Sequence, residues 1–424
     1  MIKVSFVIKL KCSRCGAEYS PEEKVTMCRT PGCKGLGRLD IYYNYNEISK
    51  QLSKSKLEQR KPGVWKYKEL LPIKDETKII TLGEGNTPLI KVERLGEKLE
   101  LKNLYVKNEI GNPTGSFKDR PMVIGVTKAL EFGVKTTVTA SSGNAAASLA
   151  AYSAKAGLEC YAFVPETAPI SKIAQLLLYG AKVARFKGLE KGEDPTVKML
   201  IEVSEKYGWY PCPSFGPFNP YQAEGPKTMS YEIIEQFNWS SPDVVFVPVG
   251  GGGLLAGNWK GFKEFYELGF VKNLPRIIAV QPEGCAPLIR AFKKGEDPLN
   301  ISRWERPKTV AGGLSDPYPW DGDAALKSIR ESNGDGVAVS DKEILEAQKL
   351  LAKYEGIFAE PSGVASLAGL IKMLNENKID KDETIVVEIT GSGFKDIDIV
   401  IKQFELPPAI EPNIDDLEKT LKIR

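Results

Sequence analysis

Short runs of β-branched and aromatic residues recur along the chain from about residue 104 onward, each bounded by glycine, proline or polar residues. Runs of this length and composition are typical of buried strands. They predict seven strands, over residues 104–107, 136–139, 160–164, 182–186, 244–247, 276–280 and 384–389.

Stretches with a helical pattern of apolar residues separate these strands. Residues 145–156 are rich in alanine and stop at Gly157. Residues 341–354 follow Ser340, which is spaced to form a capping box with Glu343. Strands that alternate with helices predict an α/β fold, with parallel sheets covered by helices on both faces.

Length and charge restrict the class of protein. A chain of 424 residues has room for two or three domains. With 58 basic and 55 acidic residues, its net charge of +3 does not indicate a nucleic-acid or membrane partner. A small-molecule substrate is therefore expected. The apolar core of residues 1–10 is too short and too interrupted for a signal peptide, which predicts a cytoplasmic protein.

The chain contains no histidine. This absence excludes a Ser-His-Asp or Cys-His nucleophile, a histidine zinc ligand and a histidine proton shuttle. Any acid–base chemistry must therefore come from Lys, Asp, Glu, Tyr or a cofactor.

Cysteine spacing near the N-terminus predicts a metal site. Two pairs of cysteines, each in a polar turn, match a tetrahedral zinc site with four thiolates: Cys12, Cys15, Cys28 and Cys33. Because four protein ligands leave no open coordination position, the zinc is expected to be structural. The alternative is a set of unpaired core cysteines. The three others lack ligand spacing and are expected to be packing residues: Cys160, Cys212 and Cys285.

Lys118 lies in a loop that is suited to hold an amine in a cleft. Turn-forming residues 111–115 precede it, and Asp119 and Pro121 suit the first turn of a new helix. Desolvation in such a cleft would lower the pKa of the lysine enough for Schiff-base chemistry. A solvated surface lysine is the ordinary alternative.

Three loops follow predicted strands, at the carboxyl ends where ligands collect in parallel sheets. The first starts a helix and offers hydroxyls and free N–H groups to a carboxylate or phosphate: Ser141, Ser142, Gly143 and Asn144. The second has four consecutive glycines, which let the main chain wrap an anion closely: Gly250, Gly251, Gly252 and Gly253. The third offers the hydroxyl of Thr390. A plain helix N-cap and a flexible turn are the alternatives for the first two loops.

Together these groups fit pyridoxal phosphate. Lys118 would hold the cofactor covalently, and the four glycines would bind its phosphate. Asn144 would lie beside the ring hydroxyl and Thr390 at the pyridine nitrogen, where a hydroxyl would not enforce protonation. The neighbouring Phe117 and Leu254 are expected to line the same cofactor site.

Several motifs carry a family resemblance. They are GEGNTPL at 83–89, NPTGSFKDR at 112–120, SGN at 142–144, NP at 219–220 with EG at 224–225, and EGIFAEPS at 355–362. Over about residues 80–400 the chain resembles the fold-type II pyridoxal phosphate enzymes, which share the architecture of the tryptophan synthase beta chain, and among them the threonine synthases. A four-cysteine zinc ribbon at the N-terminus is also familiar among threonine synthases of this type.

The resemblance implies a reaction in which O-phosphohomoserine and water give threonine and phosphate. Lys118 would be the base that moves the alpha and beta protons, and residues 141–144 would bind the substrate carboxylate. By similarity, Lys172 and Ser214 are candidates for binding the substrate phosphate. The expected assembly is a homodimer.

The chain departs from the family pattern at the substrate site. Gln222 stands where threonine synthases usually have an arginine for the substrate phosphate, and a neutral amide cannot replace a bidentate guanidinium. Ser392 replaces a family histidine, Pro121 replaces a glycine, and the four glycines resemble those of amino-acid dehydratases. These differences leave open a dehydratase, an ammonia-lyase or a cysteate-synthase-like enzyme. A non-catalytic binding protein with the same fold is the alternative from another class.

The strand pattern and the resemblance together predict the domain organisation. The tail is expected to form a short amphipathic helix that docks on a neighbour. The predicted domains are a zinc ribbon at 1–45, a large cofactor-binding domain at 46–117 and 217–405, a small α/β domain at 118–216, and the C-terminal tail at 406–424.

Overall fold

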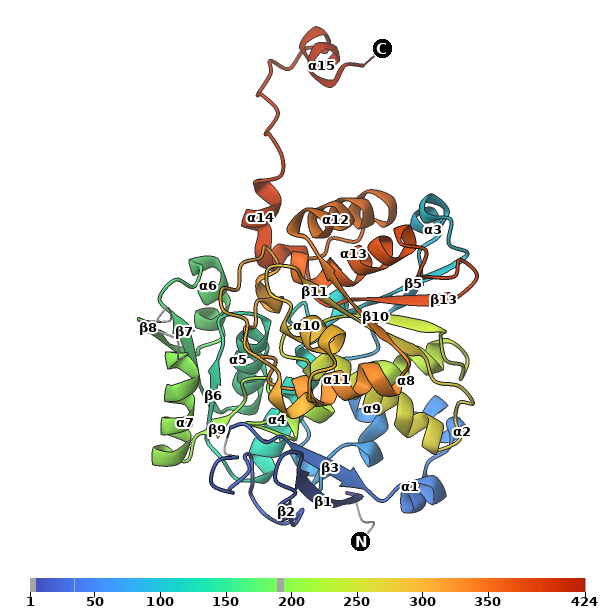
Figure 1. The fold of residues 1–424 in the computed structure, drawn as a ribbon. Helices are drawn as coiled ribbons and strands as arrows, with labels where there is room; N and C mark the ends of the chain where they lie inside the picture. Colours follow the sequence, from blue (N-terminus) through green and yellow to red (C-terminus); the bar gives the residue numbers. More distant parts are fainter. Residues whose placement is uncertain (1–4, 34, 189–193, 424) are drawn as a thin grey trace.

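Two sheets of mainly parallel strands form the body of the protein in the computed structural model, which describes residues 5–33, 35–188 and 194–423 (Figure 1). The larger sheet is parallel except for the edge strand β4, which pairs antiparallel with β5. Its strand order is β12 (Asp335–Val339), β11 (Arg276–Pro282), β10 (Val244–Pro248), β13 (Thr384–Ile389), β5 (Asn103–Asn108) and β4 (Leu89–Lys91).

The smaller sheet is parallel throughout its described strands. Its strand order is β8 (Lys182–Phe186), β7 (Glu159–Pro165), β6 (Thr136–Ala140) and β9 (Tyr210–Pro211). Because the parallel strands of each sheet point their carboxyl ends the same way, the loops after them gather at shared edges.

All seven predicted strands are present, each within two residues of its expected ends. The sequence did not predict β12, β9 or β4. In β12 Gly336, the second residue, weakens the β pattern, and β9 is only two residues long. The capping box between Ser340 and Glu343 is formed at the start of α12, as predicted.

Helices cover both sheets, as the alternating pattern predicts (Figure 1). α13 packs against the central strands of the larger sheet, and α5 and α7 both contact the middle strands of the smaller one. The helices of the body are α3 (Glu93–Leu99), α4 (Asp119–Glu131), α5 (Asn144–Ala156), α6 (Ile170–Leu178), α7 (Pro195–Tyr207), α8 (Lys227–Gln236), α9 (Gly253–Glu267), α10 (Pro287–Lys294), α11 (Gly322–Glu331), α12 (Asp341–Glu355) and α13 (Pro361–Asn375).

The N-terminal module is a small antiparallel sheet that lies at the end of the body opposite the C-terminal tail (Figure 1). Its strand order is β2 (Glu18–Tyr19), β1 (Val7–Cys12) and β3 (Leu39–Tyr43). The first four residues of the chain, on which the signal-peptide prediction partly rests, lie outside the described residues. α1 (Tyr45–Gln51), α2 (Lys54–Glu58) and a 3-10 helix at Val64–Leu70 then lead from this module along the body.

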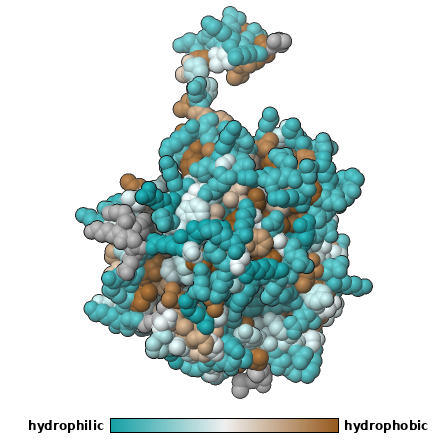
Figure 2. Space-filling view, viewed as in Figure 1, coloured by the Kyte–Doolittle hydropathy of each residue, from teal (hydrophilic) through white to brown (hydrophobic). Residues whose placement is uncertain are grey.

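The C-terminal tail stands away from the body (Figure 1). After α14 (Ile397–Ile401) the chain is exposed from Phe404 up to α15 (Ile414–Leu421). The predicted tail helix is therefore present as α15. In the space-filling view, apolar residues of the tail lie among polar ones, and Leu406 and Ile414 are 86% and 62% exposed (Figure 2). Docking of this tail on a neighbour stays a prediction.

None of the described helices combines the length and hydropathy that a membrane span requires.

Candidate active site

A cavity of about 1170 Å³ lies where loops from the two sheets meet. Its wall includes the start of α4, the loop after β6, the loop after β10 and the loop after β13. Every residue predicted for the cofactor and substrate lines it: Phe117, Lys118, Ser141, Ser142, Gly143, Asn144, Lys172, Ser214, Gln222, Gly250, Gly251, Gly252, Gly253, Leu254 and Thr390. The structure thus brings together residues from distant parts of the chain, while their individual roles stay predictions.

The amine of Lys118 is the central group of this cavity. Lys118 is the residue before α4, and its Nζ donates to Ser214 Oγ at 2.7 Å and lies 4.7 Å from the centre of the Phe117 ring. Burial lowers the pKa of the amine to about 8, although the charges of Asp321 and Asp316 partly oppose this shift. A lysine with such a pKa is partly neutral near pH 8 and can act as a nucleophile or a base.

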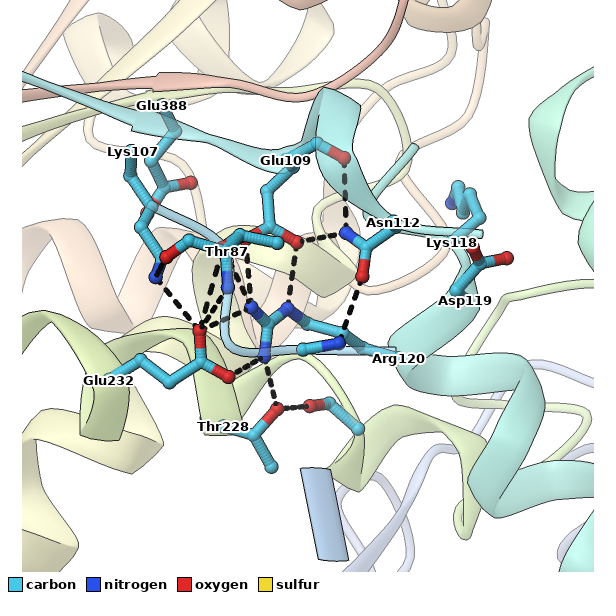
Figure 3. Close-up of polar contacts among 12 residues, drawn as sticks. Thr87, Lys107, Glu109, Asn112, Lys118, Asp119, Arg120, Thr228, Glu232 and Glu388 are labelled. Carbon is cyan, nitrogen blue, oxygen red and sulfur yellow. Dashed lines mark hydrogen bonds and ion pairs between the residues drawn. The ribbon is translucent and has the colours of Figure 1, made fainter. Parts of the chain in front are cut away.

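A buried ion network fixes the start of α4 just behind Lys118 (Figure 3). Arg120 donates to both carboxylate oxygens of Glu109 and both of Glu232, at 2.7 to 2.8 Å. Lys107 adds a second cation, 2.8 Å from Glu232. The amine of Lys118 lies outside this network, so the fixed backbone presents a lysine that is free to face the cavity (Figure 3).

The glycine loop forms an anion cradle at the start of α9. The helix begins at Gly253, so the N–H groups of its first turn have no partner inside the helix. A Cβ on Gly250 would lie 2.9 Å from the carbonyl oxygen of Gly313, and Gly252 has a φ of +100°, which L side chains rarely adopt. Larger residues would therefore displace the loop from the position that the cavity needs.

A second helix N-terminus faces the same cavity. α5 begins at Asn144, directly after the hydroxyl-bearing loop, and the Asn144 amide donates to Glu360 Oε1 at 2.7 Å. Burial raises the pKa of Glu360, while Lys395 and Lys172 oppose the shift. This end of the cavity therefore combines a helix dipole with nearby lysines, which suits an anionic ligand.

Lys172 and Gln222, which were predicted to lie at the substrate site, differ in their ability to bind a phosphate. Lys172 lies 3.2 Å from Asp396, and its side chain is 23% exposed, so the amine is accessible from the cavity. Gln222 donates its amide to the Phe215 carbonyl at 3.3 Å, and its buried Oε1 has no hydrogen-bond partner among the residues that the structure describes. A neutral amide in this position offers no charge to a dianion.

Sequence reasoning missed five charged residues that line the cavity: Asp194, which caps the start of α7, and Asp316, Asp321, Glu360 and Lys395. Burial raises the pKa of Asp316 to about 7 and that of Asp321 to about 6. Glu360 and Lys395 lie in segments that resemble the family, so those motifs could have indicated them. Asp316 and Asp321 come from a Gly- and Pro-rich stretch, whose composition predicts a loop but does not predict which part of the fold the loop contacts.

The four predicted metal ligands meet in the N-terminal module. Their sulfur atoms all lie within 4.8 Å of one another, and the Sγ atoms of Cys15 and Cys28 are 3.6 Å apart. Tetrahedral zinc–thiolate bonds of about 2.3 Å imply sulfur separations of roughly 3.8 Å, so the arrangement fits one zinc ion. The other three cysteines are buried in the core, as expected for packing residues: Cys160, Cys212 and Cys285.

The donor set of the cavity also fits pyridoxal phosphate. A buried amine with a lowered pKa can bind the aldehyde carbon, and the glycine cradle, which a Cβ would fill, can receive the phosphate.

Comparison with known proteins agrees with this geometry. A family profile described as "Pyridoxal-phosphate dependent enzyme" matches residues 80–391. The chain is 44% identical to the threonine synthase of Methanocaldococcus jannaschii, over 97% of this chain and 99% of that protein. It is 42% identical to the threonine synthase of Methanosarcina acetivorans, over 97% and 98%.

Solved structures share the fold. Threonine deaminase isoform 2 from Solanum lycopersicum superposes with a TM-score of 0.63 and 26% identity, covering 76% of this chain and 88% of that chain. Maize serine racemase gives a TM-score of 0.64 and 25% identity, covering 75% and 91%. The α/β fold of the fold-type II enzymes is thus confirmed, and the chain belongs to the pyridoxal-phosphate dependent enzyme family.

Proposed function

We propose that this protein is a pyridoxal phosphate-dependent threonine synthase, which converts O-phosphohomoserine and water to threonine and phosphate. One observation carries the proposal: the Lys118 amine, with its pKa lowered to about 8 by burial, shares one cavity with two helix N-termini that suit anions. The similarity to threonine synthases along nearly the whole chain supports the choice of substrate.

The two helix N-termini divide the anionic groups between them. The glycine loop before α9 binds the cofactor phosphate, and the loop before α5, residues 141–144, binds the substrate carboxylate. Asn144, whose amide donates to Glu360, would contact the cofactor ring, and Thr390 would be the partner of its pyridine nitrogen.

Lys118 is the catalytic base. When bound, the cofactor acts as an electron sink that acidifies the substrate alpha C–H. The neutral Lys118 amine, positioned by the Ser214 hydroxyl, takes the alpha proton and then a beta proton. Phosphate leaves from the gamma carbon, and the two protons taken return to the gamma and alpha carbons. Water adds its hydroxyl at the beta carbon, and its remaining proton goes to the released phosphate. The buried wall of the cavity keeps the amine desolvated, so that it is neutral for part of the time at neutral pH.

Cations near the α5 end of the cavity bind the substrate phosphate. Lys172 is the principal candidate, with Lys395, because Gln222 is neutral. Charge-assisted hydrogen bonds contribute about 1.5 to 3 kcal/mol. Lys172→Ala should therefore weaken turnover of O-phosphohomoserine on the order of tenfold, while Gln222→Arg should leave it equal or improve it.

The remaining assignments complete the proposal. The four-cysteine module binds one structural zinc ion, because its thiolates fill a tetrahedral shell. The protein acts in the cytoplasm as a homodimer. Its domains are the ribbon at 1–45, a large domain at 46–117 and 217–405, a small domain at 118–216, and the tail at 406–424.

A side-by-side substrate panel tests the function. Purified protein loaded with pyridoxal phosphate is given O-phosphohomoserine, serine or threonine at equal concentration, and release of phosphate, ammonia and 2-oxo acid is followed. Phosphate and threonine should form fastest from O-phosphohomoserine. Faster ammonia release from serine or threonine would instead identify the dehydratase or ammonia-lyase that the neutral Gln222 leaves open. No turnover of any substrate, with the cofactor bound, would favour the non-catalytic binding protein.

A further inference from the structure

Arg38 extends from the cysteine module to the wall of the active-site cavity. It lies next to Gly37, where a Cβ would come within 2.5 Å of the Cys12 sulfur, and its carbonyl accepts from the Ser13 backbone N–H at 2.8 Å. The backbone of Arg38 is therefore fixed by the turns that hold the four thiolates. Its side chain is only 15% exposed.

The Arg38 guanidinium meets a carboxylate cluster on the body. Its Nε lies 3.4 Å from Asp323 and 3.9 Å from Asp321, and Asp40 in the module pairs with the same guanidinium. Asp321 is the member of this cluster that lines the cavity, and its side chain is 3% exposed. Arg38 is thus a cation that stands directly behind an acidic residue of the active-site wall.

Asp321 joins two segments that surround the cofactor site. Its backbone N–H donates to the carbonyl of Gly251 in the glycine loop at 2.7 Å. Its carboxylate accepts from the Gly216 N–H at 3.0 and 3.1 Å. Gly216 lies two residues after Ser214, which accepts from the Lys118 amine. One residue therefore positions both the phosphate cradle and the partner of the catalytic amine.

Close packing leaves these segments little freedom to adjust. A Cβ on Gly216 would come within 2.6 Å of Arg38 Cδ, one on Gly252 within 3.1 Å of the Asp321 carbonyl, and one on Gly253 within 3.0 Å of its carboxylate. Because the contacts are this tight, a shift of Asp321 must be passed on to the glycine loop.

Charge gives Arg38 a second effect on the cradle. The Asp321 carboxylate lies at the start of α9, next to the place where the glycine loop is proposed to take a phosphate. An uncompensated carboxylate there would repel the phosphate and weaken the attraction of the helix N-terminus. The positive charge of Arg38 offsets that repulsion.

We infer that Arg38 is a positioning residue, through which the cysteine module acts on the cofactor site by holding Asp321 against the glycine loop. The inference rests on the proposed function in one respect, the placement of the cofactor phosphate at residues 250–253.

Full-length Arg38→Ala tests the inference, with Arg14→Ala as its matched control. Arg14 is also an arginine of the module that contacts the body, where it donates to the Leu299 carbonyl at 3.2 Å, away from the described cavity lining. The affinity of the apoprotein for pyridoxal phosphate and the 31P resonance of the bound phosphate are measured for each variant, together with zinc content and melting temperature.

Arg38→Ala should weaken cofactor affinity on the order of tenfold and shift the 31P resonance, at unchanged zinc content. Arg14→Ala should match the wild type in both readouts, and Arg38→Lys should recover part of the affinity because it restores the charge. A wild-type affinity and resonance for Arg38→Ala would overturn the inference. Equal losses in Arg38→Ala and Arg14→Ala would also overturn it, because docking of the module would then matter rather than this contact.

A double-mutant cycle keeps the test decisive if Arg38→Ala folds poorly. Asp321→Asn removes the charge that Arg38 compensates, so Arg38→Lys should lose less affinity in the Asp321→Asn background than alone. Additive losses would contradict the coupling. Failure of the wild type to bind pyridoxal phosphate at Lys118 would refute the proposed function itself, whereas normal binding with no effect at Arg38 would refute only this inference.

Discussion

Two clusters of buried charge lie on either side of the start of α4: the Arg120 network behind it, and Lys118 with the cavity aspartates in front of it. They differ in how completely their charges are paired. Behind the helix, Arg120 and Lys107 meet Glu109 and Glu232 through hydrogen bonds of 2.7 to 2.8 Å (Figure 3). In front of it, within the described structure, the Lys118 side chain donates a hydrogen bond to the neutral hydroxyl of Ser214.

The difference in pairing separates structural charges from reactive ones. Burial favours a raised pKa for Glu232, but Arg120 and Lys107 outweigh it and hold the pKa well below its usual range. Burial lowers the pKa of Lys107 as well, yet that amine donates to a carboxylate and to the Thr87 carbonyl. Among the described residues, Lys118 has no such anionic partner within hydrogen-bond distance, so its amine is available to bond to a ligand.

The largest expected difference between the clusters is catalytic. Lys118→Ala should lower turnover on the order of a thousandfold or more, because the base and the covalent link to the cofactor are both removed. Lys107→Met changes an equally buried lysine in the other cluster. The variants are compared by kcat and by the amount of cofactor fixed with borohydride.

Lys107→Met should still fix the cofactor, whatever its cost in stability. A fully active Lys118→Ala, or loss of fixed cofactor in a folded Lys107→Met alone, would reverse the roles of the two clusters.

The next largest expected effect is a loss of stability when the ion network around Arg120 is broken. Arg120→Met should destabilise the apoprotein by about 3 to 5 kcal/mol in urea, because Glu109 and Glu232 are left buried without their main cation. Arg276→Met is the control, since Arg276 pairs with Glu383 at 2.6 Å but is about one-third exposed. It should cost at most about 1 kcal/mol.

The same network predicts an acid limit to stability. Because the folded pKa of Glu232 is lowered from 4.5, its contribution is complete above that pH and is lost as pH falls toward the folded value. Urea midpoints should therefore fall more steeply between pH 5 and 3 in the wild type than in Arg120→Met. Parallel curves for the two proteins would show that the network does not titrate on unfolding.

The smallest expected effect is a gain in stability, and it comes from replacing a residue of the cavity. Lys118→Met should stabilise the apoprotein by about 2 kcal/mol at pH 7, because it removes a buried charge without an anionic partner. The folded pKa of Lys118 is about 8 against 10.5 for a free lysine, so the cost of the charge is complete below pH 8. The advantage of the variant should shrink as pH rises from 8 to 10.5. A variant less stable than the wild type at pH 7 would mean that Lys118 is paired after all.

Local sequence was enough to predict the cavity residues that follow strands. The four glycines, the loop at 141–144 and Lys118 each combine a turn signal with a helix start, and such signals depend on neighbours in the chain. Parallel topology then brings the loops together, which made the cofactor predictable.

Contacts between distant segments were beyond such reasoning. Arg38 and Asp321 lie far apart in the sequence, and nothing in either neighbourhood indicates the other. The raised pKa of Asp316 likewise follows from burial in the folded cavity rather than from its Pro- and Gly-rich surroundings. The completeness of the Arg120 network could not be predicted either, because its partners lie directly after β5, on α8 and in the loop before β4.

The position of β13 between β10 and β5 has a consequence for synthesis of the protein. The strands of the smaller sheet all come from residues 136–211 and can pair early, whereas the larger sheet cannot close until β13 at 384–389 has left the ribosome. Until then, apolar β10 has an open edge and the cavity lacks one wall. We therefore expect the nascent chain to depend on chaperones until translation is nearly finished, however stable the finished enzyme is.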